Sequence, residues 1–531
     1  MIRSGKALCR ALTSSCCVPV RHSVSGKAWI TPKGFDTGIK TFNSLTKQKE
    51  ALILAREGTA TWFDILQRIL TRVFGVTVIH AMVITDVDDK IIRRSWEENV
   101  SPDVISRMYE EEFKRDMLSL KVVPPAVYLR VTENVHHIVA FIEGIIRNGH
   151  AYATKEGDVY FDVQSIGDRY GKFVGAVSPH GQSGSSNKRD SRDFALWKRS
   201  KAQEPHWESP WGRGRPGWHI ECSTVASHMF GNQLDIHSGG IDLAFPHHEN
   251  EIAQSEAFHQ CGQWANYFLH SGHLHHKGSP EKMSKSLKNY ITIKDFLQSH
   301  TADEFRMFCL STKYRSAIDY SDGSMSEART SLETIRTFIS AARAYMKGHL
   351  HCPPTQEDLL WQRLTEAKSN ILTALADDFD TPRAVGALMK LVYHGNCQLR
   401  PVSTAEGGVR SPAVFGAMVT YVRDVLDAFG IDLLHSREAD VMSSGGNLQA
   451  VVEQLTRFRS EVRAFALTRQ DPQDKKSDLC PDRIPLLKSC DTLRKDLAPL
   501  GVVIKDRGAT STWEIKPTQS GQRSHEPDQQ T

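Results

Sequence analysis

The chain shows two successive patterns of apolar and polar residues. From Thr41 to about Asp319, short β-rich runs alternate with helical stretches, which is typical of α/β folds with a parallel sheet. Beyond Met325, apolar residues recur at helical spacing. This spacing predicts helices over Ser326–Met346, Glu357–Phe379, Pro412–Phe429 and Leu448–Leu467. We therefore expect an α/β domain followed by a mostly α-helical region.

The α/β part contains a clear candidate for a buried strand, Val76–Ile84. Asp86, Asp88 and Asp89 follow at its carboxyl end. Open α/β sheets bind ligands in the loops at that end of their strands, so we expect this region to face a functional site. The Gly- and Ser-rich stretch Gly181–Asp193 is typical of an exposed loop and is expected within an inserted subdomain.

Composition is that of an ordinary globular protein. Hydrophobic residues make up 40% and charged residues 24% of the 531 residues, which excludes a wholly disordered chain. The longest mostly apolar run, Val73–Ile84, is interrupted by His80 and is too short to span a bilayer, so we expect no membrane span. The ten cysteines show no regular short spacing, which indicates reduced thiols rather than a disulfide scaffold.

The positive charge is concentrated at the N-terminus. The formal net charge is +4, but residues 1–35 hold six basic side chains and no acidic one, which leaves the remainder slightly acidic. Global charge therefore gives no argument for nucleic-acid binding. The Ser-rich, acid-free start has the composition of a mitochondrial transit peptide, and the alternative is a solvated tail without function.

Three residues of different types form a candidate metal site. His247 and Glu251 are four residues apart, so they lie on one face of a helix that starts after Pro246. Together with Cys222 they offer sulfur, nitrogen and oxygen ligands that suit zinc. A lone buried cysteine, or a histidine near a helix start, is usually structural. The combination with Trp218 and a nearby Gly-rich turn favours zinc binding.

A second candidate site is a lysine-rich loop. It consists of Lys282, Met283, Ser284, Lys285 and Ser286. Two lysines on a loop of small residues can hold phosphates and balance the charge that develops during nucleotidyl transfer. A Lys/Ser pentapeptide in isolation is usually a solvated loop, but its place between an α/β body and a helical half favours the phosphate role.

These motifs together resemble those of the class I aminoacyl-tRNA synthetases. The strings Trp218–Cys222, His237–Asp242 and His247–Glu251 are similar to those of the cysteine-specific enzymes, and the basic N-terminal segment resembles that of their mitochondrial members. The resemblance extends from about Thr41 to Trp513. It includes the strings Thr85–Ile92, Asp193–Lys198, Tyr314–Ser316 and Asp378–Pro382.

The resemblance implies an architecture. We expect a Rossmann-like class I catalytic domain with an insertion, followed by a mostly α-helical anticodon-binding region. The expected parts are a transit peptide (1–35), the catalytic domain (36–325, with the insertion at about 125–205), the helical anticodon-binding domain (326–440), a small C-terminal domain (441–517) and a disordered tail (518–531).

The resemblance also implies the chemistry. ATP, with Mg²⁺, would activate cysteine as cysteinyl-adenylate, and the cysteine would then pass to tRNA(Cys) in the mitochondrial matrix. Zinc held by Cys222, His247 and Glu251 would select cysteine, because zinc prefers a thiolate strongly over the hydroxyl of serine. Trp218 would pack on the substrate side chain, and His237 and Asp242 would help to build the amino-acid pocket. The loop Lys282–Ser286 would bind ATP, with Lys282 and Lys285 acting in catalysis. We expect the helical half to read the anticodon and the protein to be a monomer.

The sequence departs from the family at one place. Thr61–Trp62 runs directly into Phe63–Asp64, whereas the family has a further strand and a His-x-Gly-His turn between them. The loss of roughly twenty residues removes the first zinc thiolate and the histidines that meet ATP at a helix N-terminus. Such a clean junction is typical of alternative splicing or of a gene-model gap. The string His270–His273 also matches the His-x-Gly-His pattern. It lies too close to Lys282, however, to replace a turn that must follow the first strand.

Two hypotheses follow. One is a cysteine–tRNA ligase whose activity is impaired by several orders of magnitude and whose zinc binding is weakened. The other is a noncatalytic variant that keeps a tRNA-binding helical half, or that misfolds because its sheet lacks a central strand. The family resemblance also allows cysteine persulfide synthesis with pyridoxal phosphate, using lysines near Lys90 and in the Lys282–Lys285 loop. Arg93, however, stands where a second lysine is usual, and it cannot form a Schiff base.

Overall fold

The computed structural model describes residues 29–54, 64–173, 187–276, 290–401, 410–433, 446–467, 481–507 and 510–515. The chain divides into two compact units. The first contains Met1–Ala328, Ile371–Val385 and Ala428–Gly430, and the second contains Arg329–Asn370, Gly386–Asp427 and Ile431–Thr531. The chain therefore passes between the units several times.

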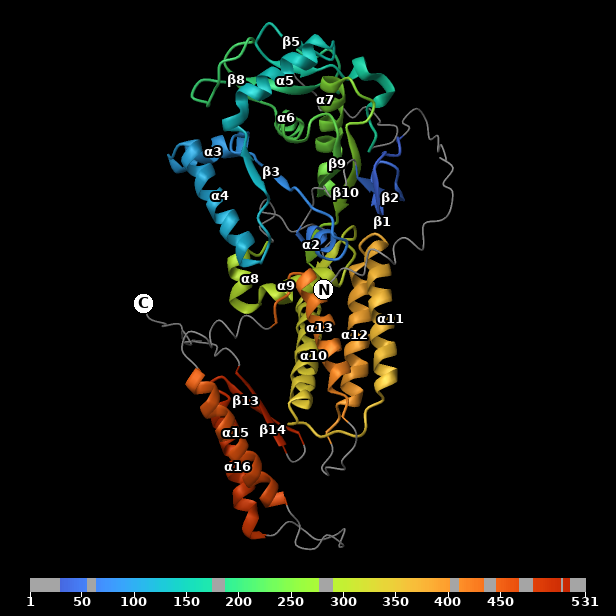
Figure 1. The fold of residues 1–531 in the computed structure, drawn as a ribbon. Helices are drawn as coiled ribbons and strands as arrows, with labels where there is room; N and C mark the ends of the chain where they lie inside the picture. Colours follow the sequence, from blue (N-terminus) through green and yellow to red (C-terminus); the bar gives the residue numbers. More distant parts are fainter. Residues whose placement is uncertain are drawn as a thin grey trace, which may run out of the picture. The chain divides into compact units, whose positions relative to one another are not determined.

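The first unit is the α/β part of the molecule (Figure 1). It contains two parallel strand pairs, β3 (Ala81–Ile84) with β4 (Val127–Arg130), and β9 (Leu234–Gly240) with β10 (Ala265–Ser271). A third parallel pair joins β11 (Leu274–His276) to β12 (Ile318–Tyr320). The antiparallel sheets are the hairpin of β1 (Phe35–Asn43) and β2 (Gln48–Leu54), and the four-stranded sheet of β5 (Ala151–Ala153), β6 (Val159–Phe161), β7 (Phe194–Arg199) and β8 (Gly214–Pro216).

The two larger parallel pairs differ in how completely they are covered. Every residue of β10 from Ala265 to His270 is buried, whereas all residues of β3 and β4 are half-buried. The far edge of β10 is covered by the end of β1, because Phe268 donates its N–H to Asn43 and accepts from the N–H of Ser44. Among the described residues, β3 pairs with β4 and not with β9, so these two pairs form separate sheets.

The predicted strand Val76–Ile84 is shorter in the structure. Strand β3 begins at Ala81, and Ile79 before it is 40% exposed. Val76 is buried, but its N–H bonds to the carbonyl of Leu70 and so belongs to the turn that ends helix α2 (Asp64–Arg72). An apolar run thus contains a helix-ending turn as well as a strand, and periodicity alone does not separate the two.

The helices of the first unit have well-defined starts. Asp88 caps α3 (Asp89–Glu98), Ser101 caps α4 (Pro102–Ser119), and Thr301 forms a capping box on α9 (Ala302–Leu310). The other helices of this unit are α5 (Val135–Arg147), α6 (Trp218–Phe230), α7 (Glu249–His259) and α8 (Ile293–Ser299). Helices α5, α6 and α7 pack on one another over a core that includes Ile138, Phe161 and Trp197. This packing fixes α6 and α7, the two helices that carry the site described below.

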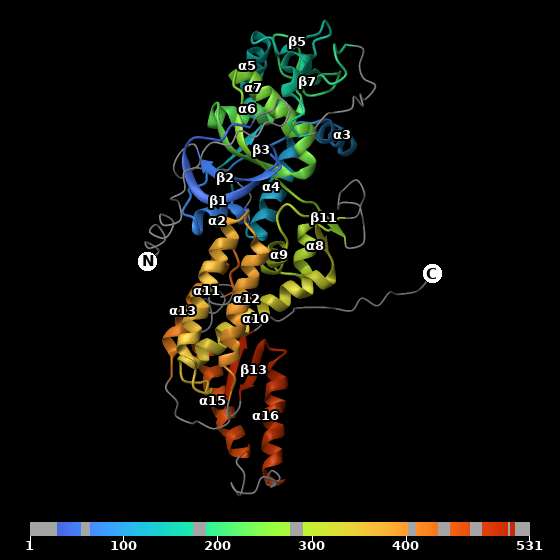
Figure 2. The same ribbon diagram turned by 90° about the vertical axis from the view of Figure 1, so that its right-hand side faces the viewer.

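The second unit is mostly helical, as predicted. It is built on α10 (Asp322–Met346), α11 (Glu357–Ala376), α12 (Thr381–Gln398) and α13 (Pro412–Ala428), followed by α15 (Gly446–Leu467) and α16 (Ile484–Leu497). Helices α10 to α13 lie side by side in both views (Figures 1 and 2). The four helices predicted from spacing are confirmed. Helix α12 and the closing hairpin of β13 (Val502–Arg507) and β14 (Thr510–Ile515) were not predicted.

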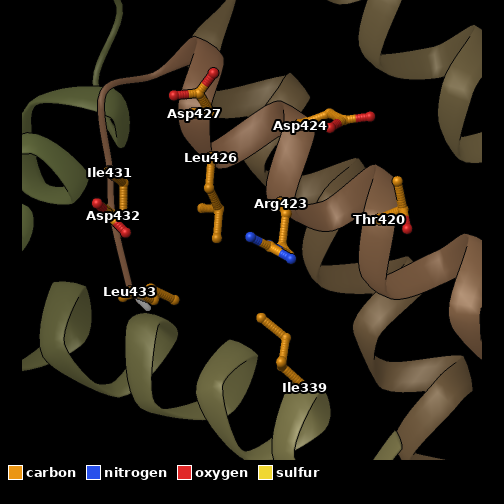
Figure 3. A pocket seen from close by; sticks show the side chains of 9 residues that line it. All are labelled: Ile339, Thr420, Arg423, Asp424, Leu426, Asp427, Ile431, Asp432 and Leu433. Atoms are coloured by element: carbon orange, nitrogen blue, oxygen red, sulfur yellow. The ribbon is translucent and has the colours of Figure 1, made fainter. Parts of the chain in front are cut away.

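A pocket of about 380 Å³ lies within the second unit. Figure 3 shows the guanidinium of Arg423 at its centre, above Ile339 and beside Leu426. Asp424, Asp427 and Asp432 also line it. The pocket therefore offers both a cation and carboxylates.

Two general expectations hold for the described residues. No helix there is both long and apolar enough to cross a membrane. The described cysteines, namely Cys222, Cys261, Cys309, Cys352, Cys397 and Cys490, are free thiols, as the irregular spacing predicted.

Candidate metal and amino-acid site

Helix α6 brings Trp218 and Cys222 to the site. The helix starts directly after Gly217, where an added Cβ would lie 2.1 Å from the carbonyl oxygen of Ala195 in β7. Only glycine allows this close approach, so the start of α6 is held against the four-stranded sheet of β5 to β8. Trp218 remains 49% exposed at the first turn, and Cys222 lies one turn further on.

A short helical turn before α7 positions His247 and Glu251. Phe245 has extended backbone angles, so the helical run begins at Pro246 and continues into α7, as the sequence predicted. His247 and Glu251 lie on one face, with His247 Nε2 3.0 Å from Glu251 Oε1. Both side chains are buried, and Glu251 is fully buried. The i, i+4 spacing therefore brings the two expected ligands into contact.

The three expected zinc ligands converge. One ligand atom from each of Cys222, His247 and Glu251 lies within 4.8 Å of the others. Burial raises the pKa of the Cys222 thiol well above its ordinary value, so without a nearby cation this thiol keeps its proton. Neither carboxylate oxygen of Glu251 has an aligned hydrogen-bond partner among the described residues. A buried carboxylate beside a thiol and an imidazole is a donor set that fits zinc.

Further histidines surround these ligands. His219 Nδ1 lies 2.9 Å from His247 Nδ1, and His248 Nδ1 lies 2.8 Å from His270 Nε2. Burial lowers the pKa of His219 to about 3, of His248 to about 2 and of His270 to about 4. These imidazoles are therefore neutral at pH 7, which is the form that binds metals or relays hydrogen bonds.

Two of the three residues expected in the amino-acid pocket, Trp218 and His237, contact the same cluster. The ring of Trp218 packs against that of His247, with 4.4 Å between centroids. His237, on β9, places Nε2 2.9 Å from Glu251 Oε2. Asp242 lies on the turn after β9, with Oδ1 3.0 Å from His273 Nε2. His237 thus contacts an expected zinc ligand directly.

Two sequence motifs remain untested by the geometry. The loop Lys282–Ser286 and the junction Thr61–Phe63 lie outside the described residues. The string His270–His273 is described, and His270 lies within strand β10, where its Nδ1 is 2.8 Å from Ser44 Oγ. It is therefore not at the start of a helix, where a phosphate-binding turn would place it.

Sequence reasoning missed the histidines behind the ligands. His219, His248 and His270 were not predicted as parts of the site. His219 and His248 lie next to predicted residues, so the excess of histidine in these strings was a usable signal. His270 reaches the cluster through the pairing of β10 with β9, which sequence spacing does not reveal.

Comparison with known proteins shows the family to which the chain belongs. Residues 47–330 match the family described as tRNA synthetases class I (C) catalytic domain. A Xenopus tropicalis protein described as "Probable cysteine--tRNA ligase, mitochondrial" is 54% identical over 521 residues, covering 92% of this chain and 91% of that protein. The chain belongs to the cysteine–tRNA ligase family. It is a class I synthetase and therefore an enzyme by family.

Distant members of the cysteine–tRNA ligase family match over similar lengths. The cytoplasmic enzyme of Dictyostelium discoideum is 39% identical, with 92% of this chain and 79% of that protein covered. The enzyme of Thermococcus onnurineus is 35% identical, with 90% and 98% covered. The alignment with the Xenopus protein runs over 521 residues while covering 92% of a 531-residue chain, so it includes positions that this chain lacks.

Proposed function

We propose that this chain ligates cysteine to tRNA(Cys) by way of cysteinyl-adenylate, at the expense of ATP, in the mitochondrial matrix. The observation that carries the proposal is the convergence of Cys222, His247 and Glu251 beneath the exposed ring of Trp218. The family assignment supports the reaction, and the name of the Xenopus relative and the basic N-terminal segment support the location.

Selection of cysteine would depend on a metal. Cys222, His247 and Glu251 would hold zinc, which when bound supplies a preference for the thiolate of cysteine over the hydroxyl of serine. Trp218 leaves half of its surface open to pack on a side chain, and it braces the ring of His247. His237 lies on the other side of Glu251, with its Nε2 2.9 Å from Oε2.

The remaining substrates would meet other parts of the chain. We assign ATP with Mg²⁺ to Lys282, Lys285 and the rest of the lysine loop, where paired positive charges would stabilise the adenylation transition state. We assign the tRNA anticodon to the helical unit, whose described residues include the pocket around Arg423. His237 and Asp242 would complete the amino-acid pocket. Cysteine persulfide synthesis with pyridoxal phosphate is not part of the proposed function, because Arg93 cannot form a Schiff base.

We further propose that this particular chain is catalytically impaired. Support comes from the division of the parallel sheet into the pairs β3–β4 and β9–β10, which are not joined among the described residues. Support also comes from the positions that the alignment with the Xenopus protein includes and this chain lacks. A missing strand and turn would remove the ATP-binding element opposite the lysine loop and one thiolate from the zinc site. Zinc binding would be weakened but retained by three ligands.

A noncatalytic protein is the second candidate. The half-buried state of every residue of β3 and β4 favours it, because a strand in the middle of a parallel sheet is normally buried on both faces. In that case the helical unit would bind tRNA without charging it.

The deciding experiment measures cysteine-dependent ATP–pyrophosphate exchange and aminoacylation of tRNA(Cys). The purified chain is compared with a form in which the segment missing between Trp62 and Phe63 is restored. We expect the restored form to charge cysteine and not serine or methionine, and this chain to be slower by several orders of magnitude. Charging of serine in preference to cysteine by the restored form would contradict the function. Rates within about tenfold of each other, about 1.4 kcal/mol of barrier, would contradict the impairment.

Zinc and location have separate tests. Zinc retained by this chain through prolonged chelator dialysis, at parity with the restored form, would contradict weakened binding. Fusion of residues 1–35 to a fluorescent reporter should direct it to the mitochondrial matrix. A diffuse cytosolic signal would contradict the proposed location.

A further inference from the structure

Glu251 belongs to two clusters of potential metal ligands. Oε1 lies 3.0 Å from His247 Nε2, on the side of Cys222, and Oε2 lies 2.9 Å from His237 Nε2. The side chain is fully buried, yet neither oxygen has an aligned hydrogen-bond partner among the described residues. A buried carboxylate without such partners is costly unless a cation faces it. The zinc site of the family accounts for one face of Glu251 and leaves the other face unexplained.

The second face is built like a metal site. One ligand atom from each of His237, His248 and Glu251 lies within 4.8 Å of the others. His237 Nε2 is itself buried without an aligned hydrogen bond, although a carboxylate oxygen is only 2.9 Å away. A short distance without alignment is expected when two donor atoms converge on a common point rather than on each other. Two imidazoles and one carboxylate are a frequent ligand set for divalent transition metals.

The ring of His248 is held in the orientation that such a site needs. Its Nδ1 lies 2.8 Å from His270 Nε2, and His270 Nδ1 lies 2.8 Å from Ser44 Oγ. If His270 donates to Ser44, its Nε2 accepts the Nδ1–H of His248, which leaves Nε2 of His248 as a free donor atom. Gly239 lets β9 lie against this ring, because an added Cβ would be 2.8 Å from His248 Cε1. Metal-binding histidines are commonly oriented by such a bond from the other ring nitrogen.

We propose that His237, His248 and Glu251 form a second site for a divalent transition metal, which shares Glu251 with the Cys222–His247–Glu251 site and competes with it. The second site has nitrogen and oxygen donors only, so it accepts Co²⁺, Fe²⁺ or Mn²⁺ as well as zinc. The two sites hold one ion between them. A second dication beside one carboxylate would leave excess positive charge in a buried place.

The test titrates Co²⁺ into the metal-free chain and reads both affinity and spectrum. A thiolate ligand gives Co²⁺ a charge-transfer absorption in the near ultraviolet, whereas nitrogen and oxygen ligands give only the weaker visible bands. The starting variant is Cys222→Ser. It should still bind one Co²⁺ per chain, with affinity within about tenfold of the parent and without the thiolate band.

Two neighbouring substitutions then separate the sites. In the Cys222→Ser background, His248→Gln should weaken Co²⁺ binding by about tenfold or more, while His247→Gln should change it by less than about threefold. The reverse order would overturn the proposal, because the residual ion would then sit at the first site. Loss of all Co²⁺ binding in folded Cys222→Ser would overturn it as well.

A variant that keeps the Cys222 thiol shows whether loss of the thiolate band comes from a change of site rather than from misfolding. His247→Gln alone should bind Co²⁺ without the thiolate band, since the ion then occupies the second site. Persistence of the thiolate band in His247→Gln would contradict the proposal. Circular dichroism of each variant confirms that the helices are intact. None of these readouts depends on aminoacylation, so the proposal can fail while the proposed function stands.

Discussion

The two longer parallel strand pairs of the first unit, β3 with β4 and β9 with β10, contrast in completeness. Strand β10 is buried along Ala265–His270, its far edge is bonded to Asn43 and Ser44, and β9 beside it carries His237. Strands β3 and β4 are half-buried throughout, although the carboxyl end of β3 leads to Asp86 and Asp88. The pair β9–β10 therefore supplies His237 to the ligand cluster, and the other ligands come from α6, α7 and the turn before α7.

The contrast teaches which functions can survive a missing segment. Cys222, Glu251 and His237 lie on α6, α7 and β9, and His247 lies on the turn before α7. Of these elements, α6 also packs on β3, whereas among the described residues β9 pairs with β10 and not with β3. Under the proposed function, ATP would be held by both halves, so metal binding would persist where catalysis does not. Loss of a strand costs a parallel sheet more than an equal loss costs a helical bundle, since each strand satisfies the backbone groups of two neighbours.

Restoring the missing segment is the largest test of the comparison. A segment that pairs with both β3 and β9 should raise the aminoacylation rate by about 10³-fold or more, equal to about 4 kcal/mol of barrier. Amide hydrogen exchange gives the structural readout, and Ala81–Ile84 should become as protected as β10. Recovery of activity without new protection of β3 would break the comparison.

Matched core substitutions compare the two halves directly. Leu269 in β10 is fully buried, so Leu269→Ala should lower the free energy of unfolding by about 2–5 kcal/mol. Val83 in β3 is half-buried, so Val83→Ala should cost only about 1 kcal/mol. Denaturant titration of both variants measures this. Equal losses would mean that β3 is as well packed as β10.

Two glutamates in the first turn of α7, Glu249 and Glu251, separate metal binding from folding. Glu251→Gln should weaken zinc binding by about 100-fold or more. This loss is larger than that caused by removing a residue that only orients a metal ligand. Glu249 instead accepts the N–H groups of Gly171 and Phe173, at 2.7 and 2.8 Å. Glu249→Gln should cost about 1.5–3 kcal/mol of stability and leave zinc affinity unchanged. Loss of zinc binding in folded Glu249→Gln would show that the metal site depends on the hydrogen bonds from Gly171 and Phe173 to Glu249.

Two glycines of the helical unit provide control substitutions, for which we expect the smallest changes in stability and no change in zinc binding. On α12, an added Cβ at Gly395 would lie 2.3 Å from the ring of Phe338, whereas at Gly386 nothing lies within 4 Å. Gly395→Ala should destabilise by about 1–3 kcal/mol through overpacking. Gly386→Ala should stabilise by about 0.5–1 kcal/mol through helix propensity. Thermal unfolding measures both, and neither change should alter zinc binding. A change in zinc binding would show that the site depends on the helical unit.

Sequence reasoning succeeded where the interactions are local. Helical spacing predicted α10, α11, α13 and α15 to within a few residues, because apolar residues recur along an amphipathic helix with the helical period. The i, i+4 relation of His247 and Glu251 was confirmed for the same reason. Helix α12 was not predicted; it begins at Thr381, within the string Asp378–Pro382.

Long-range relations could not be predicted in this way. His270 reaches His248 and Ser44 only because β10 lies between β9 and the end of β1. The contact of His237 with Glu251 joins a strand to a helix that follows it. The division of the parallel sheet is likewise a property of pairing. The sequence predicts that a strand is missing, and this stays a prediction. It does not indicate which edges such an absence would leave unjoined.

The repeated passage of the chain between its two units has a consequence for synthesis. The first unit takes in Ile371–Val385 and Ala428–Gly430 after the chain has already entered the second unit. Within the returning segment, Asp378 accepts the N–H of Phe42 and binds the guanidinium of Arg315. Arg306 likewise donates to the carbonyl of Phe429. The first unit therefore cannot finish folding on the ribosome until residue 430 has left the exit tunnel. Its fold stays incomplete while most of the chain is translated.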